Sequence, residues 1–474
     1  MMVVMQDAAA AAPPRDPRWL LALAWIAGFT LIDSSIVSLA LPDIARDFDR
    51  SVGQLAWVST GFLLALAATL LAAGRLGDRF GFRPVLAIGG VGFLLATLAC
   101  GLAPSFEALI AARIAQGIAG GILYTVSLAI TVTAFPPERR AWAIGIYFTS
   151  GALGAVIGPV IGGLLTDLGG WRIVFLAQLP LPLLVAIGAL VLLPARSGRP
   201  GAMDLPGIGL ASVFIVAATL ALLQLSEPGG ATGALIAVVI ALAALIGFIA
   251  VERRAREPAV RLGIFRNPRF VVATVAGAGA WFAIMSSTIY PALYLQFGRG
   301  ISATQAGLLL LAAPLVGLVF FPFAGRMVGR IGVDRSLLIG LVLLVAAAAL
   351  MIGWNGETPL WMIVAINLVT GAGIALTLVA SATDAMAQFS PEEAGTGSAV
   401  FNSLRQLGAA MGVAIPAVAF ELVAAGSRSA DAALGGSTAA FAIRLVVLAI
   451  PLLLVVGRVA GRIGSPVPPG MPGG

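Results

Sequence analysis

Long runs of apolar residues, broken by short polar stretches, set the pattern of this 474-residue chain. A helix needs about 20 apolar residues to cross the hydrocarbon core of a bilayer, and unpaired backbone groups are too costly there for open structures. The pattern therefore predicts an all-α polytopic membrane protein. We expect fourteen membrane helices, at residues 19–41, 54–73, 84–102, 106–133, 140–166, 173–193, 206–225, 229–251, 270–295, 303–323, 336–353, 360–387, 396–421 and 438–459.

The composition agrees with a chain embedded in lipid. Hydrophobic residues make up 60% of it and charged residues only 10%, whereas soluble domains average about 25% charged. The net charge of +7 lies in short loops, without the basic cluster beside an aromatic surface that would indicate a nucleic-acid partner. All 28 basic residues are arginine and the chain has no histidine, so a transported proton must bind mainly to carboxylates. The single Cys100 excludes an internal disulfide and a Cys/His metal site.

The arginines are distributed unevenly between alternate loops. With a cytoplasmic N-terminus, 20 of them fall in cytoplasmic loops and tails, as the positive-inside rule requires. Arg113 and Arg405 fall within helices. The remaining six are assigned to the outside: Arg46, Arg50, Arg172, Arg299, Arg428 and Arg444. We therefore expect both termini in the cytoplasm. The Ala-rich composition, with arginine as its only basic residue, is typical of a GC-rich bacterial genome. For a bacterial protein of this kind, we expect the inner membrane as its location.

Short motifs recur along the chain at a nearly constant offset. Gly74–Gly81 corresponds to Gly325–Gly332 at an offset of 251, and Gly154-xxx-Gly158 corresponds to Gly408-xxx-Gly412 at an offset of 254. Two repeated halves are a common plan for secondary transporters. The expected organisation is a tail at 1–18, a six-helix bundle at 19–193, a linker at 194–269 with two extra helices (206–225 and 229–251), a second six-helix bundle at 270–460 and a disordered cytoplasmic tail at 461–474.

The loop after the second predicted helix reads Gly74-Arg-Leu-Gly-Asp78-Arg79-Phe-Gly81-Phe-Arg83. Glycine permits a tight turn between two helices, and an acid such as Asp78 is favoured at a helix N-terminus. The arginines can pair with acids, so the loop can form a latch that breaks and reforms. An ordinary positively charged cytoplasmic loop is the alternative.

The fifth predicted helix contains Gly154-Ala-Val-Ile-Gly158-Pro159-Val-Ile-Gly162-Gly163. Glycines four residues apart share one helix face and let another backbone approach closely. Pro159 removes a backbone donor and is expected to bend the helix. Simple close packing, with no bearing on the direction of transport, is the alternative.

These motifs, with Arg113-Ile-Ala-Gln116-Gly117 and the stretch Leu31–Pro42, resemble the major facilitator superfamily, specifically its fourteen-helix drug:proton antiporter branch. The resemblance implies two six-helix bundles with two inserted helices. It also implies that the loop Gly74, Asp78, Arg79, Gly81 and Arg83 is a cytoplasmic gate, and it associates the motif of the fifth helix with export. Phe82 departs from the family pattern, which commonly has a second basic residue there.

Asp33 and Arg113 are ionisable residues inside predicted membrane helices, a costly placement that usually marks a pathway or a pair. At about 1.5 Å per residue, both lie about 20 Å from the cytoplasmic side, so the two can meet. We predict that Asp33 binds the coupling proton and that Arg113 tunes this binding. A static ion pair between two helices is the alternative. The coupling mechanism requires the carboxylate to reach a water-accessible cavity.

In the second copy of the repeat, Met285 stands at the position equivalent to Asp33, and Asn367 stands at the position equivalent to Arg113. We therefore expect proton chemistry in the first half and an apolar wall in the second. Aromatic and methionine side chains around one carboxylate suit a lipophilic or cationic substrate. Ordinary helix packing is the alternative for each aromatic residue. The predicted substrate-binding residues are Trp25, Phe29, Asp33, Gln116, Trp281, Met285, Tyr290 and Tyr294.

The remaining charged residues of the membrane segments receive weaker predictions. Asp384 and Glu421 are expected near the two membrane interfaces, and Arg405 has no acid at an obviously matching depth. The sequence contains no nucleotide-binding loop, catalytic nucleophile set or metal cluster, so we expect no enzyme, no cofactor and an ion gradient as energy source.

The leading interpretation is a monomeric transporter that exports small molecules, several drugs among them, in exchange for protons. A dedicated exporter of one endogenous metabolite and a non-transporting membrane sensor are the alternatives.

Overall fold

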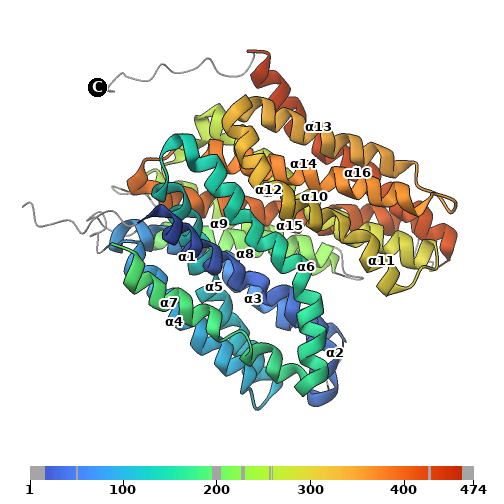
Figure 1. The fold of residues 1–474 in the computed structure, drawn as a ribbon, viewed down its shortest axis with the longest axis horizontal. Helices are drawn as coiled ribbons and strands as arrows, with labels where there is room; N and C mark the ends of the chain where they lie inside the picture. The colour runs from blue at the N-terminus through green and yellow to red at the C-terminus, as the bar shows by residue number, and fades with distance from the viewer. Residues whose placement is uncertain are drawn as a thin grey trace, which may run out of the picture.

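Helices account for all the regular structure in the described part of the chain (Figure 1). The computed structural model describes residues 16–49, 52–194, 204–225, 230–255, 258, 260–424 and 429–461. Thirteen helical stretches in these ranges are long and apolar enough to cross a membrane. The prediction of an all-α polytopic membrane protein is therefore confirmed. The count of fourteen and the side of each terminus stay predictions, and most of both predicted tails lies outside the described residues.

The first half of the fold differs from the predicted segments mainly at three places. One helix covers Val52–Phe80 and continues seven residues past the predicted end at residue 73, so Gly74–Phe80 of the predicted loop is helical. The predicted helix 19–41 is interrupted by a short 3₁₀ turn just before Asp33, and the fifth and sixth predicted helices run together with a sharp turn at Gly169 and Gly170. The elements are α1 (Pro17–Phe29), η1 (Thr30–Ile32), α2 (Asp33–Phe48), α3 (Val52–Phe80), α4 (Phe82–Gly101), α5 (Phe106–Ala134), α6 (Pro137–Leu176) and α7 (Pro180–Leu192).

Two apolar helices, α8 (Leu205–Leu225) and α9 (Ala231–Glu252), follow the first half and pack on each other. The second half then contains η2 (Leu262–Arg266), α10 (Pro268–Leu293), η3 (Tyr294–Gly298), α11 (Ala303–Leu310), α12 (Ala312–Ile331), α13 (Val333–Ile352), α14 (Leu360–Met386), η4 (Pro391–Glu393), α15 (Ala394–Ala424) and α16 (Ala430–Val459). Helix α8 contacts both α3 and α15, so the inserted pair lies against both halves.

The internal repeat of the sequence extends to backbone geometry and packing. Gly81 and Gly332 occupy the same place in their loops, and both have a φ of 86°, which favours glycine. A Cβ on Gly117 would lie 2.3 Å from the carbonyl oxygen of Phe62, and one on Gly371 would lie 2.4 Å from that of Ala313. The two halves therefore use corresponding glycines for corresponding close contacts between helices.

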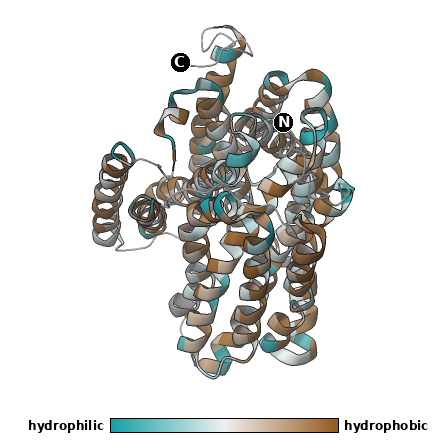
Figure 2. Ribbon diagram, turned by 90° about the vertical axis from the view of Figure 1, so that its left-hand side faces the viewer, coloured by the Kyte–Doolittle hydropathy of each residue, from teal (hydrophilic) through white to brown (hydrophobic). Residues whose placement is uncertain are grey.

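Hydrophobic residues run along the lengths of the helices, while hydrophilic residues gather mainly at their ends (Figure 2). Large apolar side chains are exposed on the outer surface, for example Ile246 at 68%, Leu453 at 69% and Trp361 at 70%. In water such a surface would be unfavourable, whereas in lipid it costs nothing. The exposed apolar surface therefore agrees with a membrane-embedded fold.

Contacts between the halves concentrate at the end of the molecule that carries the Gly74–Arg83 loop. There α3 packs on α15, and α6 packs on α12. A Cβ on Gly145 would lie 2.4 Å from the carbonyl oxygen of Phe321, so these last two backbones nearly touch. At the opposite end, α2 and α11 spread apart (Figure 1). The halves are thus closed at one end, which the arginine distribution predicts to be cytoplasmic.

Candidate functional site

Asp33 lies at the point where the first membrane helix is broken, as the first residue of α2. Its side chain has no exposed surface. One carboxylate oxygen forms an ion pair with Nη1 of Arg113 on α5, and the other accepts a hydrogen bond of 3.2 Å from Nε2 of Gln116. The ion pair predicted from matched depths in the membrane is therefore present in the structure.

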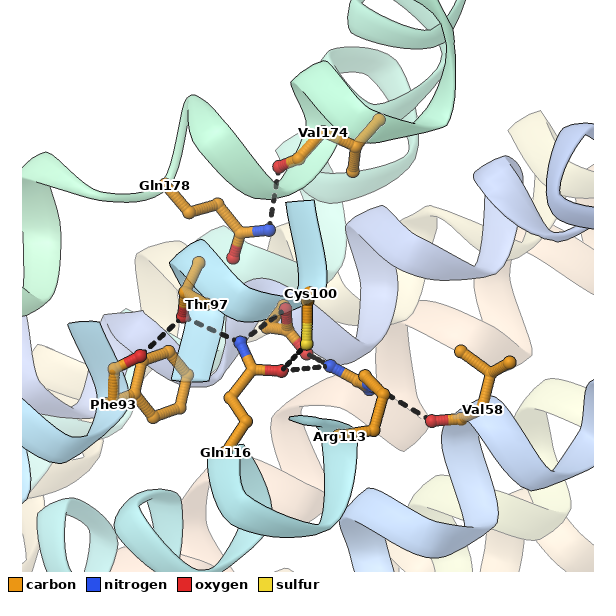
Figure 3. A network of polar contacts seen from close by, with 9 residues as sticks. Val58, Phe93, Thr97, Cys100, Arg113, Gln116, Val174 and Gln178 are labelled. Carbon is orange, nitrogen blue, oxygen red and sulfur yellow. Dashed lines mark hydrogen bonds and ion pairs between the residues drawn. The ribbon is translucent and has the colours of Figure 1, made fainter. Parts of the chain in front are cut away.

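A second set of contacts fixes Arg113 and Gln116 on one face of α5. The Nε of Arg113 donates to the carbonyl of Val58 at 2.8 Å, and its Nη1 also donates to Oε1 of Gln116 at 2.6 Å. Gln116 donates in turn to the hydroxyl of Thr97 at 2.9 Å (Figure 3). The guanidinium stacks over the ring of Phe62, 4.5 Å from its centroid. Both charges are hydrogen-bonded, which offsets part of the cost of burying the pair, although Nη2 of Arg113 has no hydrogen-bond partner among the described residues.

The same packing closes the carboxylate to water in this conformation. Asp33, Arg113 and Gln116 all have no exposed surface. Water therefore does not reach Asp33 in this conformation. Proton coupling requires such access, so the surrounding helices must move to provide it. The 3₁₀ turn Thr30–Ile32 directly before Asp33 supplies a place for such a movement, because short 3₁₀ stretches within helices often mark hinges.

The glycine motif of α6 packs directly on the segment that carries Asp33. A Cβ on Gly154 would lie 3.2 Å from the side chain of Ile32, and one on Gly162 would lie 2.6 Å from the carbonyl oxygen of Ile36. Gly158 is buried and Gly163 is half-buried. These glycines therefore serve the close approach that their spacing predicts.

The predicted bend at Pro159 is not where α6 breaks. The backbone stays helical through this proline, and the non-helical residues are Gly169 and Gly170. Gly170 has a φ of 76°. The chain reverses there because glycine accepts a positive φ at little cost, whereas a proline is tolerated in a membrane helix when its neighbours satisfy the freed carbonyl.

Asp78 of the predicted gate loop reaches across to the other half. Its carboxylate accepts hydrogen bonds from the backbone N–H groups of Gly395, at 2.7 Å, and Thr396, at 2.8 Å, and from the Thr396 hydroxyl at 2.6 Å. These groups form the first turn of α15, where backbone donors are free and the helix dipole favours an anion. Gly74 completes the contact, since its Cβ position is only 2.4 Å from the carbonyl oxygen of Gly395.

The arginines of the gate loop make fewer polar contacts than the latch hypothesis predicts. Arg79 lies over the ring of Phe80, 5.3 Å from its centroid, and Arg75 donates to the carbonyl of Pro258 at 2.7 Å. Arg83 and Gly81 line a cavity of about 830 Å³ at this end. Among the residues of this loop that the structure describes, Asp78 and Gly74 therefore make the contacts with the other half.

Of the other predicted substrate-binding residues, Gln116 alone is hydrogen-bonded to Asp33 in the described part of the chain. Trp25 and Phe29 stack with ring centroids 5.2 Å apart, and the indole of Trp25 donates to Thr149 at 2.8 Å. Both rings are half-buried, as is Met285 on α10. Trp281 lies beside Arg405, and its ring centroid is 5.0 Å from the central carbon of the guanidinium.

The two predicted tyrosines lie within the second half, and their hydroxyls are engaged there. Tyr290 donates to the carbonyl of Val413. Tyr294 donates to the carbonyl of Asn355 at 2.6 Å and accepts from Arg299 at 3.2 Å. In this conformation, therefore, both tyrosines pack and form hydrogen bonds within the second half, as the alternative of ordinary helix packing predicts.

Several charged residues are more buried within the protein than the sequence indicates, although Asp384 lies two residues before the end of α14, where it was predicted. Arg444, assigned to the outside, is fully buried within α16, and the assignment was wrong because the helix begins eight residues before the predicted segment 438–459. Asp384 is only 7% exposed and pairs with Arg458 at 2.6 Å. Arg458 also pairs with Asp334. The second half is thus not simply an apolar wall.

The fold and the site together define a class of protein. Two repeated helical halves, close glycine contacts between helices and an acid–guanidinium pair buried in one half are the features of a secondary transporter. The chain belongs to the Major Facilitator Superfamily, whose sequence profile matches residues 23–413. Members of this family carry small molecules across membranes, and they are transporters, not enzymes.

Curated relatives of the chain carry names from drug resistance and export. It is 34% identical to a "Tetracenomycin C resistance and export protein" of Streptomyces glaucescens, over 84% of this chain and 74% of that one. It is 32% identical to the "Multidrug resistance protein Stp" of Mycobacterium tuberculosis, over 81% and 72%.

A solved structure shares the fold at low sequence identity. The human organic anion transporter MFSD10 (TETRAN) superposes with a TM-score of 0.70 at 17% identity, covering 94% of this chain and all of that one.

Replacement of Arg113 by methionine is expected to destabilise the protein. The change leaves Asp33 buried without a cation, and breaking a buried pair in this way costs about 3–5 kcal/mol. A second change, Asp33→Asn, should recover part of the loss because it removes the stranded charge. Thermal unfolding of the purified single and double variants measures this. A single variant as stable as the wild type would show that the pair contributes nothing to the fold.

Proposed function

We propose that this protein exports small lipophilic molecules across the inner membrane of a bacterium in exchange for protons, working as a monomer by alternating access. The observation that carries the proposal is the fully buried Asp33, paired with Arg113 and placed at the break between α1 and α2. An ionisable group held in a membrane core is costly and marks a pathway. The chain has no histidine, so carboxylates are the natural carriers of the proton.

The names of the relatives support export as the direction of transport. One relative is a "Tetracenomycin C resistance and export protein", and a second, 34% identical, is a "Methylenomycin A resistance protein" of Streptomyces coelicolor. The "Multidrug resistance protein Stp" supports a broad substrate range. A 27% identical "Riboflavin transporter RibZ" of Clostridioides difficile supports the alternative of one dedicated metabolite.

The coupling follows from what a proton would do to the buried pair. A proton on Asp33 removes the negative charge that holds the guanidinium of Arg113, so the two helices that carry them lose their electrostatic tie. The break at Thr30–Ile32 lets α2 move while α1 stays in place. Because Gly154 and Gly162 pack α6 on this segment, α6 moves with it and transmits the change to α12 in the other half.

The contact of Asp78 with α15 closes the opposite end while α2 and α11 stand apart. Under the predicted orientation, this conformation is closed toward the cytoplasm, and a movement that exposes Asp33 to the outside would let cargo leave and a proton enter. Return to the inward-facing state requires Asp78 to leave the first turn of α15. Two sites in the first half therefore govern the cycle, the proton site at Asp33 and the gate at Asp78.

Efflux from proteoliposomes with and without an imposed pH gradient tests the coupling. We expect at least one member of a set of lipophilic fluorescent molecules that includes a cation, an uncharged molecule and an acid to leave several times faster when the gradient is present. The same preparation treated with a protonophore is the control, because it retains the protein and the membrane but loses the gradient. Equal efflux under all three conditions would contradict proton-driven export.

A broad resistance panel in an expressing strain separates the two versions of the function. Resistance to several unrelated compounds supports multidrug export, and resistance to none or to one supports a dedicated exporter. A non-transporting sensor predicts no counterflow in proteoliposomes.

A further inference from the structure

Arg405 is a fully buried cation at the interface of the two halves. It lies on α15 and is 1% exposed. Its Nη1 donates to Oδ1 of Asn402 at 2.8 Å, on the same helix, and its Nη2 donates to the hydroxyl of Tyr124 at 2.8 Å, on α5 of the first half. One guanidinium therefore joins the half that carries Asp33 to the half that does not.

Aromatic rings surround this guanidinium on several sides. The ring centroids lie 5.0 to 5.7 Å from its central carbon and come from three elements besides its own helix. Two rings belong to the first half and two to the second; they are Tyr124, Phe148, Trp281 and Phe401. Such a cage stabilises a cation, but it leaves the net charge uncompensated.

Within the described residues, no carboxylate pairs with Arg405. Its Nε is a buried donor without a partner, and the indole N–H of Trp281 beside it is another. Asp33, the acid predicted for the cavity, has both oxygens bonded to Arg113 and Gln116. A buried charge that no acid compensates is costly, and a buried donor without an acceptor adds to the cost.

An anion would satisfy all of these groups at once. It would supply the missing negative charge and would accept from the Nε of Arg405 and from the indole of Trp281, while the surrounding rings would pack on a flat apolar body. A cation placed here would instead meet a like charge in a medium of low dielectric. The site therefore selects acidic molecules and disfavours the cationic cargo that the sequence left open.

We propose that Arg405 is the docking point for an acidic group on the cargo, and that the cargo is a flat aromatic acid that carries a carboxylate or phenolate. The inference rests on the proposed export function and names the chemistry of the molecule exported. Because the site joins both halves, a bound acid bridges α5 and α15 and is released as they separate.

Binding of matched probes to the purified full-length protein tests the proposal. The probes are 2-anthracenecarboxylate, its uncharged amide 2-anthracenecarboxamide, and the cation tetraphenylphosphonium, titrated at neutral pH by calorimetry. We expect the acid to bind about tenfold more tightly than the amide, since a charge-assisted hydrogen bond is worth more than a neutral one. We expect tetraphenylphosphonium to bind more weakly than the acid.

Three variants assign this preference to Arg405. Arg405→Gln should lose it. Asn402→Asp should lose the preference as well, because a carboxylate in place of the Asn402 amide would neutralise the guanidinium of Arg405 internally. This variant keeps the arginine, and the new ion pair should raise the unfolding temperature. Ser403→Ala is the matched control, because its buried hydroxyl has no partner and its removal should leave the preference unchanged.

An acid that binds wild type no better than its amide overturns the proposal, as does a preference that survives in both Arg405→Gln and Asn402→Asp. These outcomes are separate from the failure of the proposed function. Acid-selective binding without any effect of a pH gradient on efflux would retain the docking site and refute proton-driven export. Gradient-driven efflux without acid selectivity would do the reverse.

Discussion

Replacement of Asp33 by asparagine is expected to reduce export driven by a pH gradient to the rate of empty vesicles. Asparagine has nearly the same size and can still accept a hydrogen bond from Arg113, so the helices should remain in place, although the buried guanidinium loses its counter-charge and the variant should unfold at a lower temperature than the wild type. It cannot take up and release a proton, which the proposed cycle requires. The variant should therefore fold, bind cargo and exchange it down a concentration gradient, but it should lose the coupling between cargo and protons.

Two measurements on one preparation separate coupling from transport itself. Efflux with an imposed pH gradient should disappear, whereas counterflow without a gradient should persist. Asp47→Asn is the matched control, because it changes the same residue type on the same helix. Asp47 is exposed and pairs with Arg172 at 2.6 Å, and hydrogen bonds from Arg172 and Trp171 lower the pKa of this carboxyl. It therefore stays ionised at neutral pH, and its removal should leave coupling unchanged.

Each outcome of the Asp33→Asn experiment has a definite meaning. Gradient-driven efflux at the normal rate would show that coupling does not pass through Asp33. Loss of both efflux and counterflow, together with a lower unfolding temperature, would support the static ion pair that holds two helices together. Only the loss of coupling with retained counterflow supports the proposed mechanism.

The pair of Asp33 and Arg113 could be predicted from the sequence because helices in a bilayer have few degrees of freedom. The rise per residue and the thickness of the hydrocarbon core fix the depth of each residue, and opposite charges at equal depth have strong reason to meet. The third member, Gln116, was predicted for the substrate and instead binds both charged residues. Depth identifies which residues can meet, but it does not give the direction in which a side chain points.

Departures from regular helices were harder to predict. The break at Thr30–Ile32 contains no proline or glycine, so its sequence carries no strong helix-breaking signal. Gly154 and Gly162 of α6 bring a second backbone against the start of α2, a contact that a single sequence does not show. The turn at Gly169 and Gly170 did have a local signal, the two adjacent glycines, and the predicted boundary between the fifth and sixth helices fell there.

The partners of the buried charged residues in the second half were missed for a related reason. The partners of Arg405 come from α5 as well as from its own helix, and Asp384 and Arg458 are 74 residues apart. A single sequence does not show which of several helices will face which. The repeat predicted corresponding glycines in the two halves, but the charged residues do not follow it, since Asn367 stands at the position of Arg113 and donates only to the carbonyl of Ile363.

Replacement of Gly74 by alanine is expected to open the closed end of the molecule and to lower export about tenfold or more. The new Cβ would lie 2.4 Å from the carbonyl oxygen of Gly395 and 2.6 Å from the Cβ of Ala399. Both neighbours are fixed on α15, so the two helices must move apart. Overpacking of this kind costs about 1–3 kcal/mol, which shifts a two-state equilibrium roughly 5- to 150-fold. The separation also lengthens the hydrogen bonds of Asp78 to α15, so the gate loses both of its contacts.

Cysteine labelling reports whether the gate has opened. With Cys100→Ala as background, Ser398→Cys places a thiol on α15 where the native hydroxyl is buried and donates to the carbonyl of Thr125 across the two halves. A membrane-impermeant maleimide should label it slowly in the otherwise wild-type protein and faster when Gly74→Ala is added. Gly329→Ala is the control, because it lies in the corresponding loop of the second half and its nearest neighbour is 4.0 Å away. Normal export with unchanged labelling in the Gly74→Ala variant would mean that the approach of α3 to α15 does not hold the outward-facing state.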